Sequence, residues 1–153
     1  MRTLELKVPP PAVALLVSVA MWGISLATSR FEISAVVRNT AALAIALAGV
    51  GFAVSGILTF RRARTTINPL KPEDASSLVT SGVYRLTRNP MYLGLGLVLL
   101  AWAFFLSAPL AFLGPVVFVL YMNRFQIGPE EGMLAKLFGP EFADYQAKVR
   151  RWL

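Results

Sequence analysis

The chain has 153 residues, of which 56% are hydrophobic and 15% charged, with a mean hydropathy of +0.63, which excludes an ordinary soluble two-domain protein and indicates one membrane-embedded domain over residues 1–153. Fifteen Lys and Arg against eight Asp and Glu give a net charge of +7, which suits loops facing an anionic leaflet better than a nucleic-acid partner. The absence of Cys and His excludes disulfides, thiolate or imidazole catalysis and the usual metal ligands, so no metal is expected.

Two uncharged runs in the first 60 residues predict membrane-spanning helices. The first, from about residue 12 to 28, is about 26 Å long as a helix and just spans a bilayer, although its basic flanks Arg2 and Lys7 also resemble those of a signal peptide. The second, from about residue 40 to 60, ends at Arg61. Small residues spaced three or four apart on the second run predict a face for close helix packing: Ala44, Ala48, Gly51 and Ser55.

A third uncharged run, from Asn89 to Asn123, is too long for one span. As a single helix it would measure about 50 Å, so we expect it to fold back at Ser107–Pro109. The two resulting spans cover about residues 91–106 and 109–124, with a predicted kink at Pro115. The fold expected is therefore all-α, with four transmembrane helices and both termini on one side.

Basic residues are distributed very unevenly over the loops of this arrangement. Only Arg30 and Arg38 fall on one side of the membrane. The other 13 fall on the opposite side: Arg2, Lys7, Arg61, Arg62, Arg64, Lys71, Arg85, Arg88, Arg124, Lys136, Lys148, Arg150 and Arg151. The positive-inside rule then places the N-terminus, the loop 61–90 and the C-terminal tail in the cytoplasm, as in a protein of the bacterial inner membrane.

The C-terminal region after the fourth span predicts two short helices. Gly128–Pro129 is expected to stop the chain and start a helix over about 130–138, and Gly139–Pro140 to stop it again before a last helix that reaches Trp152. One face of the last helix is apolar, so residues 130–152 are expected to lie at the membrane interface; that face comprises Phe142, Tyr145, Val149 and Trp152.

The long loop 61–90 leads into the densest motif of the sequence. Apolar residues such as Leu78 and Val83 punctuate it, which is typical of an ordered functional loop. At its end Asn89 precedes Pro90, a pair that also serves simply as a helix N-cap with proline at the first helical position. The following Gly94-Leu95-Gly96 is equally consistent with close helix packing.

Two segments together resemble the signature of the membrane-embedded methyltransferases that include isoprenylcysteine carboxyl methyltransferase and the phospholipid methyltransferases. The first segment carries Gly82, Tyr84, Arg85, Arg88, Asn89, Pro90, Tyr92 and Gly94. The second carries Glu130-Glu131, Phe138-Gly139-Pro140-Glu141-Phe142-Ala143-Asp144-Tyr145 and Val149-Arg150-Arg151-Trp152. The likeness covers about residues 65–153, including Thr65–Pro69, and is limited to hydrophobicity in the first two spans.

The sequence departs from the carboxyl methyltransferase pattern at two places. Because of these departures, the resemblance does not imply a prenyl-cysteine substrate. Asn89 stands where those enzymes have His before the proline, and the separation between Arg124 and Glu130 is longer than usual. What remains implied is an S-adenosylmethionine-dependent methyltransferase that acts on a lipophilic or amphiphilic acceptor at the membrane–cytosol boundary.

The resemblance also implies the site residues. Arg124 and Glu130 are the catalytic candidates, and the cofactor-binding candidates are Tyr84, Arg88, Asn89, Pro90, Tyr92, Leu93, Gly94, Glu130 and Glu131. Carboxylates suit the donor's ammonium group or ribose hydroxyls, Arg suits its carboxylate, Tyr suits adenine stacking, and the amides of residues 91–93 open a helix N-terminus. Because methyl transfer from a sulfonium needs alignment and desolvation more than acid–base help, a chain without His or Cys can perform it.

Each candidate also has a structural explanation. Glu130 and Glu131 suit the dipole of a helix that starts at Pro129, Arg124 suits a snorkelling anchor, and the tyrosines suit an interfacial belt. Two other functions also remain open: a nicotinamide-dependent reductase of the membrane sterol type, for which four spans leave little room, and a non-catalytic membrane adaptor. The ordered conjunction of the two segments favours the methyltransferase.

Overall fold

The computed structural model describes residues 5–63 and 77–153, and all regular secondary structure in these ranges is helical, which confirms the all-α class. Arg2, Arg64, Lys71 and the motif residues 65–69 lie outside the described residues. The elements are α1 (Pro10–Ala27), α2 (Ala35–Arg62), the 3₁₀ helix η3 (Gly82–Arg85), α3 (Pro90–Leu106), the 3₁₀ helix η4 (Pro109–Phe112), α4 (Leu113–Tyr121), the π-helix η5 (Met122–Ile127) and α5 (Gly128–Lys148).

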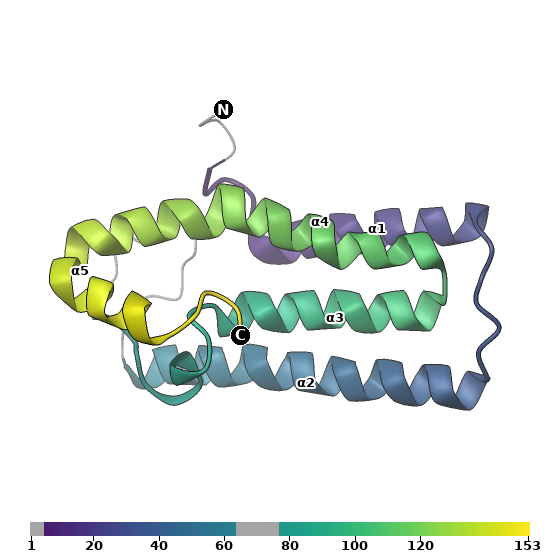
Figure 1. Ribbon diagram of the computed structural model, residues 1–153, viewed down its shortest axis with the longest axis horizontal. Coiled ribbons are helices and arrows are strands. Elements are labelled where there is room, and N and C mark those ends of the chain that lie inside the picture. Colours follow the sequence, from purple (N-terminus) through teal and green to yellow (C-terminus); the bar gives the residue numbers. More distant parts are fainter. Residues whose placement is uncertain (1–4, 64–76) are drawn as a thin grey trace.

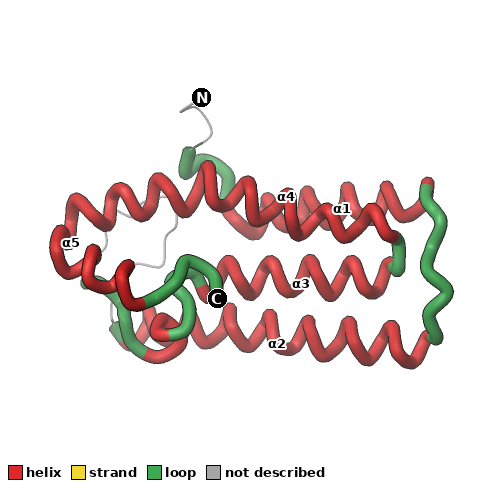
Figure 2. The backbone as a smooth tube through the Cα atoms, viewed as in Figure 1, coloured by secondary structure: helices red, strands yellow, loops and turns green. Residues whose placement is uncertain are grey.

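The apolar helices run lengthwise beside one another (Figures 1 and 2). The described N-terminal residues, the segment before α3, α5 and the C-terminus all lie at one end of this bundle, and the 28–34 and 107–108 connections lie at the other. The reversal at Ser107, which adopts a left-handed φ of 53°, confirms the predicted fold-back.

Within the described residues, three helical runs are long and apolar enough to cross a membrane: Pro10–Ala27, Ala35–Arg62 and Pro109–Lys148. The fourth apolar helix, α3, has 17 residues, so the count of four spans stays a prediction. The 40-residue run Pro109–Lys148 would measure about 60 Å, twice the hydrocarbon thickness, and it becomes highly charged from Glu130 onward. The part suited to the bilayer is therefore residues 109–127.

The predicted kink at Pro115 is absent. Pro115 lies in the first turn of α4, where a proline costs no intrahelical hydrogen bond. The irregularity falls instead at the π-helix η5, where the Gly128 N–H donates to the Asn123 carbonyl five residues back. As a result, Gly128–Pro129 does not stop the chain as predicted, and the helix runs on into α5.

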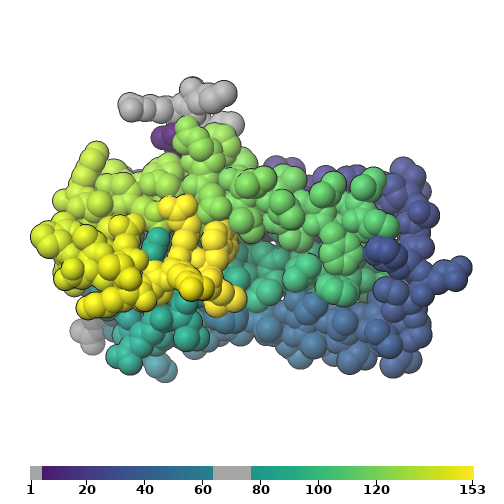
Figure 3. All heavy atoms as spheres, viewed as in Figure 1, coloured from purple at the N-terminus to yellow at the C-terminus, as the bar shows by residue number. Residues whose placement is uncertain are grey.

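The break at Gly139 is present, with φ 49° and ψ −122° inside α5. The predicted end at Trp152 is wrong, because α5 ends at Lys148 and Val149 turns to extended backbone. The predicted apolar face is also divided. Phe142 and Tyr145 are buried within the protein and Val149 packs against their cluster, whereas Trp152 packs against the core of the helical bundle. The residues from Val149 onward form a tail that folds back onto the segment before α3, which Figure 3 shows as yellow against teal.

The α2–α3 contact uses a different small-residue face from the one predicted. Ala44, Ala48, Gly51 and Ser55 are all exposed, and the buried small residues of α2 are Ala42, Gly49 and Gly56. A Cβ atom placed on Gly49 would lie 2.7 Å from the Gly94 carbonyl oxygen, and one on Gly94 would lie 2.5 Å from that of Gly49. The two backbones touch, which sets the start of α3 beside the second half of α2.

Candidate functional site

A cavity of about 80 Å³ lies at the end of the bundle that holds both described chain ends. It is enclosed by the end of α2, the segment before α3 and the two halves of α5. Its lining combines apolar and ionisable side chains: Phe60, Ser77, Leu78, Val79, Tyr84, Arg88, Asn89, Glu130, Glu131, Leu134, Phe142 and Tyr145. Two segments that are distant in the sequence thus meet at one site.

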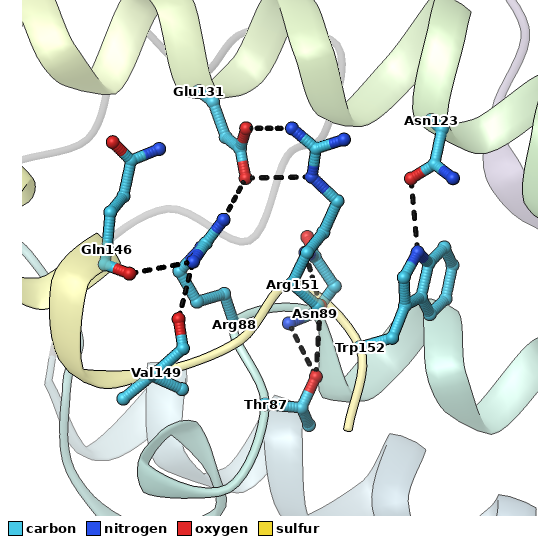
Figure 4. A network of polar contacts seen from close by, with 9 residues as sticks. All are labelled: Thr87, Arg88, Asn89, Asn123, Glu131, Gln146, Val149, Arg151 and Trp152. Atoms are coloured by element: carbon cyan, nitrogen blue, oxygen red, sulfur yellow. Dashed lines mark hydrogen bonds and ion pairs between the residues drawn. The ribbon is translucent and has the colours of Figure 1, made fainter.

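Glu131 is the charged centre of a network that Figure 4 shows. Its Oε1 accepts a hydrogen bond from Arg88 Nη2 at 2.8 Å, and its carboxylate also accepts hydrogen bonds from Nε and Nη2 of Arg151. Partial burial alone would raise the pKa of Glu131, but the hydrogen bonds from Arg151 and Arg88 outweigh it and hold the pKa below its ordinary value. Glu131 is therefore an ionised anchor for two guanidinium groups.

The same network holds the C-terminal tail against the segment before α3. The Arg88 N–H donates to the Arg150 carbonyl at 2.9 Å, and Arg88 Nη1 donates to the carbonyls of Gln146 and Val149. Asn89 occupies the N-cap position of α3, yet its side chain makes no capping bond: Nδ2 donates to the Arg151 carbonyl at 2.9 Å. The Asn89 side chain thus holds the C-terminal tail by a hydrogen bond instead of capping α3.

Glu130 points to a different set of partners. Its Oε1 accepts a 2.6 Å hydrogen bond from the Tyr92 hydroxyl and a second one from Gln126 Nε2. It lies past the apolar part of its helix, and burial raises its pKa to about 7, even though the bonds from Tyr92 and Gln126 favour the ionised form. Glu130 can therefore change its charge near neutral pH, which is typical of functional sites.

Aromatic side chains form the apolar wall of the cavity. The Tyr84 ring contacts Phe60 edge to face with centroids 5.2 Å apart, and the Tyr145 hydroxyl donates to the Tyr84 carbonyl at 2.7 Å. Burial raises the pKa of both tyrosines, that of Tyr145 to about 12, so both hydroxyls stay protonated at neutral pH. Besides the contact with Phe60, Tyr84 is buried in a cluster with Val79, Phe142 and Tyr145, and this packing holds its ring in place.

Two buried polar atoms at the cavity have no hydrogen-bond partner among the described residues: Arg88 Nε and Ser77 Oγ. Both residues line the cavity. A buried unpaired donor costs free energy unless a further group satisfies it. These atoms, together with the two carboxyl groups, supply hydrogen-bond donors and acceptors suited to a polar, charged ligand.

The structure brings five of the predicted residues together around this cavity: Tyr84, Arg88, Asn89, Glu130 and Glu131. Tyr92 joins them through its hydrogen bond to Glu130. Pro90 and Gly94 are buried by helix packing, and the Leu93 amide is already bonded to the Asn89 carbonyl. Arg124 lies outside the cavity lining: it is exposed, pairs with Glu5 at 3.1 Å and stacks over Phe125.

Several residues of the site are not among the predicted site residues. Gln126 lies just beyond the uncharged run that ends at Asn123, and Ser77 lies in a polar loop. Arg151 belongs to the second motif segment but was not a predicted site residue. Trp152, predicted as part of an apolar face, donates from Nε1 to Asn123 Oδ1 at 3.1 Å. Only the polar character of Gln126 inside an apolar helix was available as a clue.

The chain is similar in sequence to known methyltransferases. The family profile of the phospholipid methyltransferases matches residues 37–141. An uncharacterized protein of Haemophilus influenzae is 52% identical over 63 residues, which are 41% of this chain and all of that protein. A probable protein-S-isoprenylcysteine O-methyltransferase of Oryza sativa is 35% identical over 100 residues, which are 63% of this chain and 51% of that protein.

A further relative is protein-S-isoprenylcysteine O-methyltransferase B of Arabidopsis thaliana, 28% identical over 95 residues, which are 62% of this chain and 48% of that protein. The matched region thus spans about half the length of these plant relatives. No solved structure matches the chain.

Proposed function

The chain belongs to the phospholipid methyltransferase family, and from this premise we propose that it transfers a methyl group from S-adenosylmethionine to a lipophilic or amphiphilic acceptor at the membrane surface. The membership confirms the resemblance found in the sequence. The activity for which the plant relatives are named, O-methylation of protein-S-isoprenylcysteine, belongs to proteins of which this chain matches about half. Donor, acceptor and site are therefore proposed from the chain's own residues.

The observation that carries the proposal is the concentration of unpaired and ionisable groups in one small cavity. Among the described residues Arg88 Nε and Ser77 Oγ are buried without partners, and Glu130 lines the same cavity and accepts a hydrogen bond from Tyr92 of α3. S-adenosylmethionine has a carboxylate, an ammonium group and ribose hydroxyls, which are the complementary groups. Arg88 would hold the carboxylate, and Glu130 the ammonium group or a hydroxyl.

The cavity volume limits which part of the donor is held here. Small-molecule sites commonly measure roughly 300–1,000 Å³, whereas this cavity measures about 80 Å³. It suits a charged end group of the donor, not a whole nucleoside. The bound donor supplies the reactive methyl group, while the chain orients it and excludes water from one side of it.

The acceptor's hydrocarbon chain is proposed to lie in an apolar groove of about 870 Å³ between α1, α2 and α3. The groove includes Leu95, Leu99 and Trp102, which follow Tyr92 at helical spacings of three and four and so continue its face of α3. Tyr92 contacts Glu130, so this face leads from the cavity into the apolar part of the bundle. A tail entering from the bilayer gains about 0.8 kcal/mol per buried methylene.

Radiolabelled methyl transfer tests this function. The full chain in liposomes is given S-adenosylmethionine labelled on the methyl group, with long-chain and truncated acceptors that share one head group. We expect label in the long-chain product and much less in the truncated one. Transfer with equal efficiency to both would contradict lateral entry, and no transfer to carboxylate, amine or phospholipid acceptors would contradict the methyltransferase assignment.

A further inference from the structure

Gln126 is a buried amide inside an apolar helix, with 2% of its surface exposed. It lies in the π-helix η5, and its neighbours Met122 and Ile127 are completely buried. The wide turn of a π-helix changes which residues face the core, and such turns occur frequently at functional sites. Burying a polar side chain at such a place costs free energy unless hydrogen bonds compensate for the lost contact with water.

The amide of Gln126 is directed at the ionisable group of the proposed site. Gln126 Nε2 donates to Glu130 Oε1, the same oxygen that accepts the 2.6 Å bond from Tyr92. Glu130 is four residues after Gln126, one helical turn away, so the amide and the carboxyl group lie on one face. Two neutral donors from two different helices therefore fix one carboxyl oxygen.

We propose that Gln126 is a positioning residue of the donor site, whose amide holds the Glu130 carboxyl group in place and favours its ionised form for contact with the donor. This inference rests on the proposed function. The π-helix η5 then serves to bring Gln126 and Glu130 together on the helix face that meets Tyr92. Gln126 itself does not line the cavity, so it acts through Glu130.

Within residues 5–63 and 77–153, few other ionisable groups lie around Glu130. Tyr92 approaches from α3, Tyr84 from η3, and Glu131 is its neighbour on α5. Arg88 lines the same cavity but is paired with Glu131. Glu131 opposes ionisation of Glu130, whereas the bonds from Tyr92 and Gln126 favour it. Removal of the Gln126 amide should therefore make Glu130 a weaker acid.

The test measures this acidity in two ways, with purified full-length protein. The thermal midpoint of the donor-free protein is recorded from pH 5 to 9, and the affinity for S-adenosylhomocysteine is titrated over the same range. Gln126→Met keeps the volume and removes the amide; Gln126→Glu keeps the shape. Ser25→Ala, which removes an equally buried polar group of α1, is the matched control.

We expect both Gln126 variants to shift the pH midpoint of both curves upward, by about threefold to tenfold in proton affinity, while Ser25→Ala leaves it unchanged. Glu130→Gln should abolish the transition. Variants that lose thermal stability but keep the wild-type pH midpoint would overturn the proposal. Failure of the wild type to bind S-adenosylhomocysteine at any pH would overturn the proposed function alone, because the donor-free curve tests the Gln126–Glu130 contact independently.

Discussion

Arg88 donates from Nη2 to Glu131 Oε1 at 2.8 Å, although 43 positions separate the two residues in the sequence. Their side chains are only 12% and 13% exposed. Arg151 reaches the same carboxylate from the tail. One carboxyl group therefore links α5, the segment before α3 and the C-terminal tail, and the first two of these line the site.

Glu131→Gln should destabilise the protein by about 1.5–3 kcal/mol, because it removes charged hydrogen bonds to two arginines and leaves Arg88 buried. Thermal unfolding of purified protein measures the loss. Glu141→Gln is the control, since Glu141 is exposed on the same helix. Equal midpoints for the two variants would contradict an anchoring role for Glu131.

Stability should be highest near pH 4.5 and should fall between about pH 4.5 and pH 7. The folded-state pKa of Glu131 is lowered, so its contribution is complete above its unfolded value of 4.5 and is lost as the pH falls. The folded-state pKa of Glu130 is raised to about 7, so folding is favoured at low pH and weakened as the pH rises towards 7.

Thermal midpoints between pH 3 and pH 9 measure this profile. Glu131→Gln should flatten the acid limb and Glu130→Gln the limb towards neutral pH. A wild-type midpoint that rises steadily from pH 5 to pH 8 would refute the assignment for Glu130.

Gly49→Ala should destabilise the α2–α3 contact by about 1–3 kcal/mol, because the new methyl group would lie 2.7 Å from the Gly94 carbonyl oxygen. Gly51→Ala, two residues along, has open space around it and should be neutral or slightly stabilising through helix propensity. Unfolding midpoints of the two variants provide the comparison. A harmless Gly49→Ala would show that the backbones are not in contact.

The end of the bundle that carries the site is predicted to face the cytoplasm, from the 13-to-2 distribution of basic residues. The native chain has no cysteine, so single cysteines at exposed Ser81 and Ser29 report the two ends without background. An impermeant thiol reagent added to intact cells should label position 29 and spare position 81. Labelling of position 81 would reverse the topology.

The apolar helices and the fold-back at Ser107 could be predicted from the sequence, because they depend on local runs of hydrophobic residues. The contacts between them could not. A spacing of three or four residues allows several faces on α2, and the face chosen, with Gly49 and Gly56, depends on where α3 packs. Similarly, Asn89 has the local signature of an N-cap, but a tertiary bond to the Arg151 carbonyl replaces the cap.

In the C-terminal half, too, local sequence signals do not predict the contacts between segments. Gly128–Pro129 is a strong local stop signal, yet the π-helix carries the chain through it because proline fits the first turn of the following helix. The motif residues around Arg88 and Glu131 indicated a shared site. The role of Gln126 and the position of the tail depend on contacts between segments that no local pattern encodes.

The most direct test of the donor site is calorimetric titration of the purified protein with S-adenosylhomocysteine, and separately with NADPH. We predict binding of S-adenosylhomocysteine alone, weakened roughly tenfold to a hundredfold in Glu130→Gln through loss of a charged hydrogen bond, and unchanged in Glu32→Gln at the opposite end of the bundle. Binding of NADPH instead, no binding of either compound, or wild-type affinity in Glu130→Gln would contradict a methyl-donor site at this cavity.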